Sequence, residues 1–550
     1  MIALRSRSVF PLTVAAVALL FLGLFLLYPV IAVFHVSFLD KTGAFTLDNY
    51  VRILGRSFYQ QSLWNSLGIG ALATLAATAV GVPLAFCLAR LPVPGKSAIL
   101  VLAALPLVLP SFVGAYALVL LFGRAGIVTH ALQSLGLPTG SIYGTPGLVW
   151  VYTLTLYPYV LLPTLAAFKA VDVSIEEAGQ NLGASRWRVF WTVILPVVIP
   201  SVLSGALLVF METLENFGVP FVLAEDKPIL AVEAYKLFVG EVAANSASAG
   251  VLATLLVACT TAALLLQRYY LGRRRFATGA RTAPPELRVG HGLRWLATAF
   301  SWGVALAALL PFLTVLAIAF LEYRGPVLHP NLSLGNFADL WHRSSRPLVN
   351  TVTLATSAAL GAALLGVPVG YVLTRFRSGL SSILDVVAMM PFAIAGTVLG
   401  IGLVVAFNSG PLVLTGTPVI MVIAYMVRKL PFNVRASSAI LHQLDPSLEE
   451  ASINLGVSPV RTFVQLTVPL MLGGIVGGMV LTWVTVASEL SSTVILYSGP
   501  WATMTVVMFE ALEGTGAGIA AAAAAVLILA TAVPLLLVYR LLRRYELAMT

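Results

Sequence analysis

Long uninterrupted apolar runs are the feature that most limits how this chain can fold. Twelve runs have about 20 or more residues, each enough to cross roughly 30 Å of hydrocarbon as an α-helix. They are 9–35, 63–88, 98–122, 146–168, 192–221, 248–267, 295–321, 348–374, 381–407, 417–438, 467–496 and 516–539. Only 10% of the residues are charged, against about a quarter in soluble proteins. The chain is therefore predicted to be an all-α polytopic membrane protein with about 12 transmembrane helices, which excludes an ordinary soluble enzyme.

Basic residues predict which side of the membrane each loop faces. Arginines cluster between the sixth and seventh runs and again after the last run: Arg268, Arg273, Arg274, Arg275, Arg281, Arg288, Arg294, Arg540, Arg543 and Arg544. Because Lys- and Arg-rich loops stay in the cytoplasm, both termini are predicted to be cytoplasmic. This bias explains the net charge of +10 without a nucleic-acid partner. The first run is too long for the apolar part of a signal peptide, so we expect it to be retained as a helix.

The chain also repeats itself. One set of landmarks returns 285 positions later: Asn65 with Asn350, Gly81 with Gly366, Pro83 with Pro368, Arg90 with Arg375 and Pro106 with Pro391. A later set returns after 273 positions: Pro158 with Pro431, Glu177 with Glu450, Gly183 with Gly456 and Pro196 with Pro469. Six helices per copy is an even number, so both copies have the same orientation and the repeat is parallel. We predict a first repeat at 1–267, a basic cytoplasmic linker at 268–294 and a second repeat at 295–550.

A polar segment is repeated in the middle of each half. Residues 174–196 read SIEEAGQNLGASRWRVFWTVILP, and residues 447–469 read SLEEASINLGVSPVRTFVQLTVP. Ser-x-x-Glu at the start of each predicts a capping box, formed by Ser174 with Glu177 and by Ser447 with Glu450. Glycine is the residue type that ends helices in a left-handed conformation, and serine begins them, so Gly183, Gly456, Ser185 and Ser458 predict an elbow and a second helix. Each segment should be a short helix, a glycine elbow and a helix that continues into the membrane.

One side of each short helix is apolar. Ile175, Ala178 and Leu182 share a face in the first copy, as do Leu448, Ala451 and Leu455 in the second copy. An ordinary amphipathic loop helix is the simpler interpretation of either copy alone. Two copies with matched glycines and caps favour a docking element.

The segment resembles the cytoplasmic-loop signature of permease subunits of binding-protein-dependent ABC importers. The signature is Glu-Ala-small, three residues, Gly, nine residues, then aliphatic-x-x-Pro. Here Gly179 and Ser452 stand where alanine is usual, and Val468 replaces the usual leucine. The similarity covers nearly the whole chain, and the fused two-repeat layout most resembles the ferric iron(III) group, with relatives that handle thiamine, phosphonate, sulfate or polyamines.

The resemblance implies a type I ABC importer permease fold, with loops 172–190 and 445–463 inserted into separate ATPase subunits. The residues that it implies for this coupling are Glu176, Glu177, Ala178, Gly183, Glu449, Glu450, Ala451 and Gly456. The expected partners are two copies of an ABC ATPase, a periplasmic or extracellular substrate-binding protein and the lipid bilayer. The resemblance also implies a multi-pass location in a bacterial inner (plasma) membrane.

No nucleotide-binding element is expected in this chain. The only Gly-Lys-Ser is Gly95-Lys96-Ser97. A phosphate-binding loop requires another glycine five positions before Gly95, and that position is occupied by Arg90. We therefore expect no catalytic residue and no cofactor on this chain, with ATP and Mg²⁺ bound by the partner ATPase. Cys87 and Cys259 lie inside apolar runs and predict neither a disulfide framework nor a metal site.

Ionisable residues inside spans are costly and suggest a function. Glu212, Glu215 and Asn216 fall in the fifth run, and Glu489 falls near the matching place in the eleventh. Carboxylates suit hard cations such as Fe³⁺, so these residues could line a translocation pathway. The alternative is that they bond to neighbouring helices. An ion-coupled secondary transporter also remains open as a function, although it gives no reason for two cytoplasmic elbows.

Overall fold

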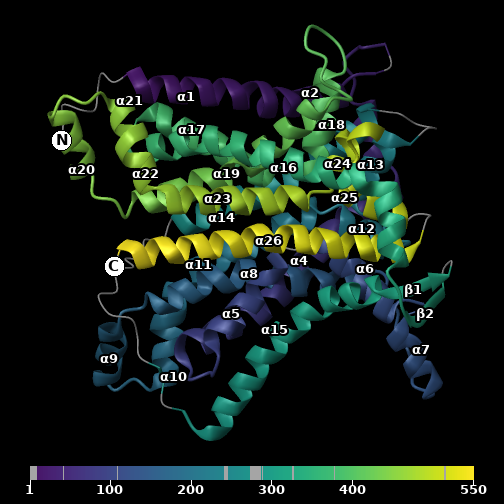
Figure 1. Ribbon diagram of the computed structural model, residues 1–550, viewed down its shortest axis with the longest axis horizontal. Helices are drawn as coiled ribbons and strands as arrows, with labels where there is room; N and C mark the ends of the chain where they lie inside the picture. The colour runs from purple at the N-terminus through teal and green to yellow at the C-terminus, as the bar shows by residue number, and fades with distance from the viewer. Residues whose placement is uncertain are drawn as a thin grey trace. The chain divides into compact units, whose positions relative to one another are not determined.

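The computed structural model describes residues 9–40, 42–107, 110–124, 126–240, 246–272, 286–287, 289–324, 327–376, 378–512 and 516–549. Helices dominate these residues (Figure 1). The strands among them, β1 (Leu321–Arg324) and β2 (Val327–Leu332), form one antiparallel hairpin. The predicted all-α class is confirmed. Much of the predicted basic cluster, including Arg273, Arg274, Arg275, Arg281 and Arg288, lies outside the described residues.

The chain forms two compact units. Unit 1 comprises Met1–Asn49, Leu237–Thr254 and Ile318–Thr550, and unit 2 comprises Tyr50–Lys236 and Leu255–Ala317. The chain passes from one unit to the other within four helices: α3 (Asp48–Leu54), α13 (Leu230–Val239), α14 (Ser246–Gly272) and α15 (His291–Ala319).

Unit 2 is built around α4, α8 and α11, which pack against one another. Its elements are α4 (Ser57–Arg90), α5 (Lys96–Ala104), η2 (Leu105–Leu107), α6 (Ser111–Phe122), α7 (Ile127–Ser134), α8 (Thr145–Lys169), α9 (Val173–Asn181), α10 (Arg186–Val189), η3 (Phe190–Ile194), α11 (Leu195–Glu215) and α12 (Gly218–Leu223). Gly81 of α4 allows a close helix crossing, since a Cβ there would lie 3.1 Å from the carbonyl oxygen of Tyr157.

Unit 1 is built in the same way around α16, α19 and α23. Its elements are α1 (Val9–Leu22), η1 (Gly23–Leu27), α2 (Tyr28–Ser37), β1, β2, α16 (Gly335–Arg375), α17 (Gly379–Met389), η4 (Met390–Ala393), α18 (Gly396–Phe407), α19 (Pro418–Leu441), α20 (Ser447–Asn454), α21 (Pro459–Thr462), η5 (Phe463–Thr467), α22 (Val468–Leu470), α23 (Leu472–Ala487), α24 (Thr493–Leu496), η6 (Gly499–Trp501), α25 (Met504–Glu510) and α26 (Ala517–Met549). Gly366, 285 positions after Gly81, lies at the corresponding crossing against Asn433.

The compact units do not coincide with the two sequence repeats, because the first helices are exchanged. α1 and α2 begin the first repeat, yet they pack on α16, α17 and α18 of the second. α15 begins the second repeat, and its Trp302 donates a hydrogen bond from Nε1 to the carbonyl oxygen of Pro94, 3.3 Å away in the first repeat. The compact units therefore do not follow the predicted division at 268–294, which stays a prediction about the sequence repeat.

Helices cover the predicted apolar runs, but the single span predicted at 98–122 is wrong, because η2 ends at Leu107 and α6 begins only at Ser111. By length and composition, eight helices in the described part of the chain can cross a membrane, and two bent pairs raise the number to ten. The bent pairs are Gly379–Ala393 with Gly396–Phe407, at 107°, and Pro459–Leu470 with Leu472–Ala487, at 75°. The run predicted at 417–438 is α19, which carries Arg428, Lys429 and Arg435 among its apolar residues. The run at 516–539 corresponds to α26, which begins at Ala517.

In the described part of the chain, three helices widen into a π-helical turn just before a proline. These turns are η1, η3 and η5, followed by Pro29, Pro196 and Pro469. Proline has no amide hydrogen to donate to the preceding turn, so the neighbouring residue bonds five positions back instead. The amide of Leu195, for example, donates to the carbonyl oxygen of Phe190.

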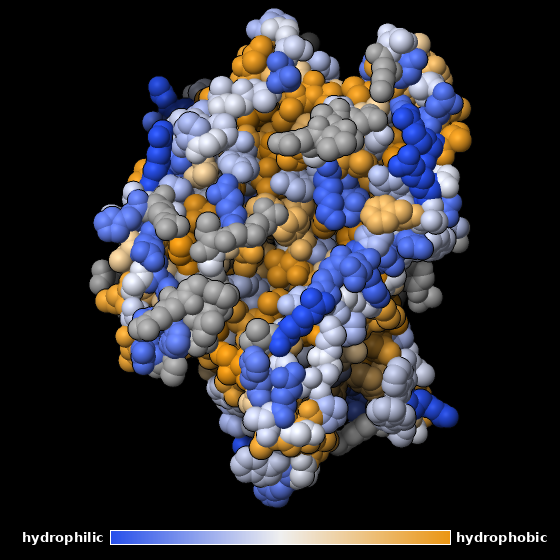
Figure 2. Space-filling model, turned by 90° about the vertical axis from the view of Figure 1, so that its right-hand side faces the viewer, coloured by the Kyte–Doolittle hydropathy of each residue, from blue (hydrophilic) through white to orange (hydrophobic). Residues whose placement is uncertain are grey.

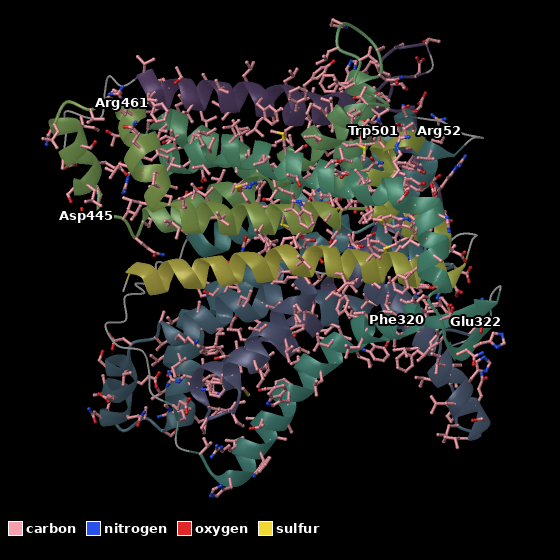
Figure 3. All side chains as sticks on the ribbon, viewed as in Figure 1. Arg52, Phe320, Glu322, Asp445, Arg461 and Trp501 are labelled. Carbon is pink, nitrogen blue, oxygen red and sulfur yellow. The ribbon has the colours of Figure 1, made fainter. Side chains whose placement is uncertain are left out.

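The two ends of unit 1 differ. α20 and α21 lie at the end where α1 begins and α26 finishes (Figure 1). Figure 3 shows Asp445 and Arg461 on either side of α20 at this end, with Phe320, Glu322 and Trp501 at the opposite end. Figure 2 looks onto that opposite side of the molecule, where hydrophilic side chains are interspersed with hydrophobic ones.

Candidate functional site

Each repeated polar segment folds as a helix, a glycine elbow and a second helix. Gly183 follows α9 with φ of 82°, and Gly456 follows α20 with φ of 87°, so both glycines are left-handed as predicted. Ser185 and Ser458 then cap the next helix, accepting hydrogen bonds from the backbone amides of residues 188 and 461 at 3.3 and 3.4 Å. The predicted helix–elbow–helix geometry is confirmed in both repeats.

The predicted capping boxes are wrong. Asp172 Oδ1 accepts a hydrogen bond from the amide of Ser174 at 2.9 Å, and Asp445 Oδ1 does the same for Ser447 at 2.9 Å. The two serines therefore lie inside their helices. An aspartate two residues earlier competes for the same amides and adds a negative charge at the helix start. The bonds from Ser447 hold the pKa of Asp445 below its usual value.

An arginine at the end of a long helix clamps each short helix. Arg90, the last residue of α4, forms a buried ion pair with Glu176 of α9. Arg375, the last residue of α16, donates from Nε to Oε1 of Glu449 at 3.2 Å. The hydroxyl of Tyr371 donates to the other carboxylate oxygen of Glu449 at 3.1 Å. The first glutamate of each Glu-Glu pair thus faces its own unit.

The residues beside these glutamates point outward. Glu177, Ala178 and Ala451 are exposed, and Glu450 is half-buried. Leu182 is 88% exposed and Leu455, its counterpart 273 positions later, is 85% exposed. The side chain of Ile175 lies outside the described part of the chain. An exposed leucine on each elbow has the character of an anchor for a partner's apolar groove.

The small residue of the signature packs the short helix onto the helix that follows. A Cβ on Gly179 would lie 3.1 Å from Cγ2 of Val189. In the second copy the hydroxyls of Ser452 and Thr462 are hydrogen-bonded at 2.9 Å. Each elbow therefore holds two helices in contact, and η3 or η5 continues the second helix into the apolar bundle.

Glu489 is enclosed by cations in unit 1. Its Oε1 accepts a hydrogen bond from Arg428 Nη1 at 2.5 Å, and Lys429 Nζ lies 3.3 Å from Oε2. Oε1 also accepts from the amide of Ser492 at 3.3 Å, at the start of α24. A Cβ on Gly396 would collide with the guanidinium of Arg428, so the glycine leaves room for the pair.

Asn216 is the counterpart of Glu489, 273 positions earlier. Its Oδ1 accepts from the amide of Val219 at 3.0 Å, and its Nδ2 donates to Ser111 Oγ at 2.9 Å. Both residues thus cap the short helix that follows them. Glu212 and Glu215 lie in the last turn of α11, directly before Asn216, and interact with Tyr159 of α8.

The Gly95-Lys96-Ser97 stretch is a turn between two helices. Gly95 has φ of 78° and begins α5, and Lys96 forms an ion pair with Glu286 at 2.7 Å. No strand leads into it, so the turn lacks the setting of a phosphate-binding loop. Among the described residues, no three His, Cys, Asp or Glu side chains are grouped so as to hold a metal ion.

The sequence matches a known family in both repeats. Residues 77–276 and 362–549 match the family model described as "Binding-protein-dependent transport system inner membrane component". The chain belongs to this family. This binding-protein-dependent permease is thus a multi-pass inner-membrane transport component in which the family's domain occurs twice, as the resemblance implied.

Curated relatives of the permease differ in how much of it they cover. It is 29% identical over 515 residues to the ferric transport system permease protein FbpB of Actinobacillus pleuropneumoniae, covering 91% of this chain and 74% of the relative. It is 29% identical over 241 residues to the sulfate transport system permease protein CysW of Synechococcus elongatus, covering 42% of this chain and 82% of the relative. A bacterial ABC transporter that imports alginate aligns with a TM-score of 0.40 and 19% identity over 47% of this chain and 93% of the solved chain.

Proposed function

We propose that this permease is the membrane-spanning subunit of an ATP-driven importer and that α9 and α20 each dock into a separate ATPase subunit. The observation that carries this proposal is the exposure of Leu182 and Leu455 on helices that Arg90 and Arg375 hold rigidly in place. A docked leucine can transmit the ATPase's movement to the membrane helices only if its short helix is held firmly against them. The partner, not this chain, would bind ATP and Mg²⁺.

We further propose that α20 and both termini face the cytoplasm. The positive-inside bias supports this orientation. The position of α20 at the end of unit 1 where α1 begins and α26 finishes is consistent with it (Figure 1). A periplasmic or extracellular binding protein would then deliver cargo to the side that holds the β1–β2 hairpin.

The proposed cargo is ferric iron. The support is that a ferric permease aligns with nearly all of this chain, whereas the sulfate permease aligns with less than half of it. Thiamine, phosphonate, sulfate and polyamines are the alternatives that the same architecture allows.

Glu212, Glu215, Asn216 and Glu489 are proposed to line the translocation pathway. Glu489 and Asn216 also cap helices, so their substitution should disturb local structure. Glu215 is the better test, because Glu215→Gln keeps size and removes one charge. We expect ⁵⁵Fe uptake to fall while ATPase activity stimulated by the binding protein persists. If both activities fall together, Glu215 is a structural residue.

The decisive experiment is reconstitution with the cognate ATPase and binding protein. Native mass spectrometry should find two ATPase subunits per permease chain, and iron-loaded binding protein should stimulate hydrolysis in proteoliposomes. A complex with no ATPase, but with uptake driven by an ion gradient, would favour a secondary transporter. If a sulfate-loaded binding protein stimulates ATP hydrolysis instead, iron would be rejected as the cargo, but the proposal of an ATP-driven importer would stand.

A further inference from the structure

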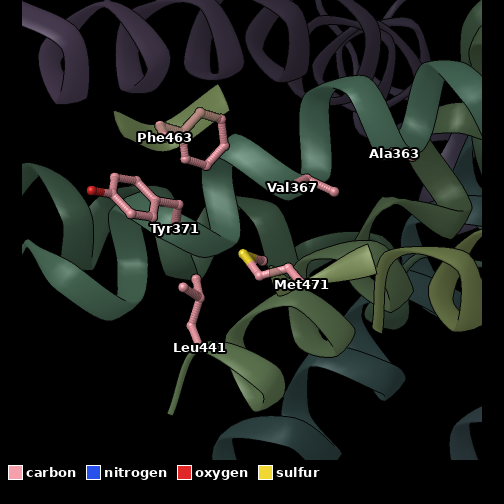
Figure 4. Close-up of a cluster of buried hydrophobic side chains, with 6 residues drawn as sticks. All are labelled: Ala363, Val367, Tyr371, Leu441, Phe463 and Met471. Carbon is pink, nitrogen blue, oxygen red and sulfur yellow. The ribbon is translucent and has the colours of Figure 1, made fainter. Parts of the chain in front are cut away.

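In unit 1, apolar side chains fill the space beside the clamped helix α20. Tyr371 and Phe463 belong to a buried cluster with Val367, Leu441 and Met471 (Figure 4). Phe10 of α1 packs onto it, with ring centroids 6.1 Å from Tyr371 and 5.4 Å from Phe463. The space that remains beside Glu449 is too small for a water molecule, and Glu449 is bonded to Tyr371 and to Arg375.

The corresponding place in unit 2 is a cavity of about 460 Å³. The repeat offsets make Val82, Phe86, Phe168 and Phe190 the counterparts of Val367, Tyr371, Leu441 and Phe463, and all four line this cavity. Its volume falls in the range of small-molecule sites, roughly 300–1,000 Å³. Most of its wall is aromatic or aliphatic.

Polar atoms at the end of this cavity lack partners. Arg90 is 2% exposed and Glu176 is 8% exposed, and both line the cavity. Arg90 Nε and Nη1 and Glu176 Oε1 are buried and form no hydrogen bond with any residue that the structure describes. In unit 1, the tyrosine hydroxyl and the carbonyl oxygen of Leu444 satisfy the matching pair. Phe86 has no hydroxyl to offer, and buried polar groups without partners are costly.

We propose that this cavity binds a small neutral amphiphile. The apolar body would lie among Phe86, Phe168 and Phe190, and a hydroxyl at its end would accept from Arg90 and donate to Glu176 Oε1. The ligand is neutral because the charges of Arg90 and Glu176 already cancel, and a third charge would be buried without a counter-ion. Since Glu176 belongs to α9, the ligand acts on one of the two elbows and not on the other.

Photolabelling of the full chain in nanodiscs tests this site. The probe is an octanol that carries a diazirine. We expect saturable labelling of peptides with Phe86, Trp187 or Phe190 and competition by 1-octanol. Methyl octyl ether accepts a hydrogen bond but cannot donate one, so it should compete about tenfold less well. Equal competition by the ether, or labelling that never saturates, would overturn the proposal and leave water as the occupant.

Variants separate this cavity from general lipid labelling. Val82→Phe and Val289→Phe place a ring in the cavity from two different segments, so one remains informative if the other fails to fold. Both should lose the specific labelling. Phe10→Ala opens the matching space in unit 1 and should create new labelling near Tyr371 and Phe463. Unchanged labelling at Phe86 and Phe190 in folded, ring-bearing variants would contradict the assignment.

Discussion

Glu489 and Arg428 form a buried ion pair with a 2.5 Å contact between Oε1 and Nη1. The same place in the first repeat holds Asn216 and Thr155, so one repeat uses a charged pair where the other uses neutral groups. Burying a charge is tolerable only when a partner cancels it. The ion pair therefore joins α19, which carries Arg428, to the segment between α23 and α24, which carries Glu489.

Glu489→Gln should destabilise the permease by about 3–5 kcal/mol, because the buried Arg428 and the half-buried Lys429 would lose the charge of Glu489. Thermal unfolding in detergent measures the loss. The double variant Arg428→Thr, Glu489→Asn imports the neutral groups of the first repeat and should recover part of the stability. A double variant no better than Glu489→Gln would show that the charge balance is not what matters.

Leu182→Asp and Leu455→Asp should leave the permease folded, since both side chains are already exposed, yet weaken ATPase binding at least tenfold. Co-purification of the ATPase with tagged permease provides the measurement. Leu332→Asp is the matched control, because Leu332 is also 85% exposed but lies on the β1–β2 hairpin. Equal loss in all three variants would rule out specific docking at the elbows.

Gly183→Val and Gly456→Val should uncouple hydrolysis from the loaded binding protein. A Cβ at either glycine would meet nothing within 4 Å, so the whole effect is backbone strain of about 1–3 kcal/mol at positive φ. Asparagine tolerates this conformation, so Gly183→Asn and Gly456→Asn should retain most stimulated ATPase activity. Coupling that is lost equally with Asn and Val would point to a steric cause instead.

The pair of Arg375 and Glu449 should show positive coupling energy in a double-mutant cycle. Each alanine variant leaves one partly buried charge unpaired, whereas the double variant leaves none, so the losses should not add. We expect an interaction of about 1–3 kcal/mol, measured by thermal unfolding. Losses that add would mean that Tyr371 and the backbone hold α20 without the ion pair.

Reporter fusions should find both repeats in one orientation. A periplasm-dependent reporter fused after Arg275 or Arg544 should be silent, and one fused near Lys227 or Arg346 should be active, because an even number of spans separates the basic segments. Activity after Arg275 would contradict the parallel repeat.

The sequence by itself determined the features that depend on local physics. Hydrocarbon thickness sets the length of the apolar runs, and the absence of a Cβ makes Gly183 and Gly456 the elbow positions. The repeat is likewise visible in the spacing of prolines and glycines. These features need no knowledge of which segments meet.

Only the tertiary structure decided which groups become partners. It gave the clamping role to Glu176 and Glu449 by bringing Arg90 and Arg375 to them across 86 and 74 positions of the chain. It packed α1 and α2, which begin the first repeat, against helices of the second repeat. It also placed Phe10 beside Tyr371, whereas the cavity beside Phe86 stays open. Local patterns cannot fix such contacts, because the energy of a buried charge or ring depends on what a distant segment places against it.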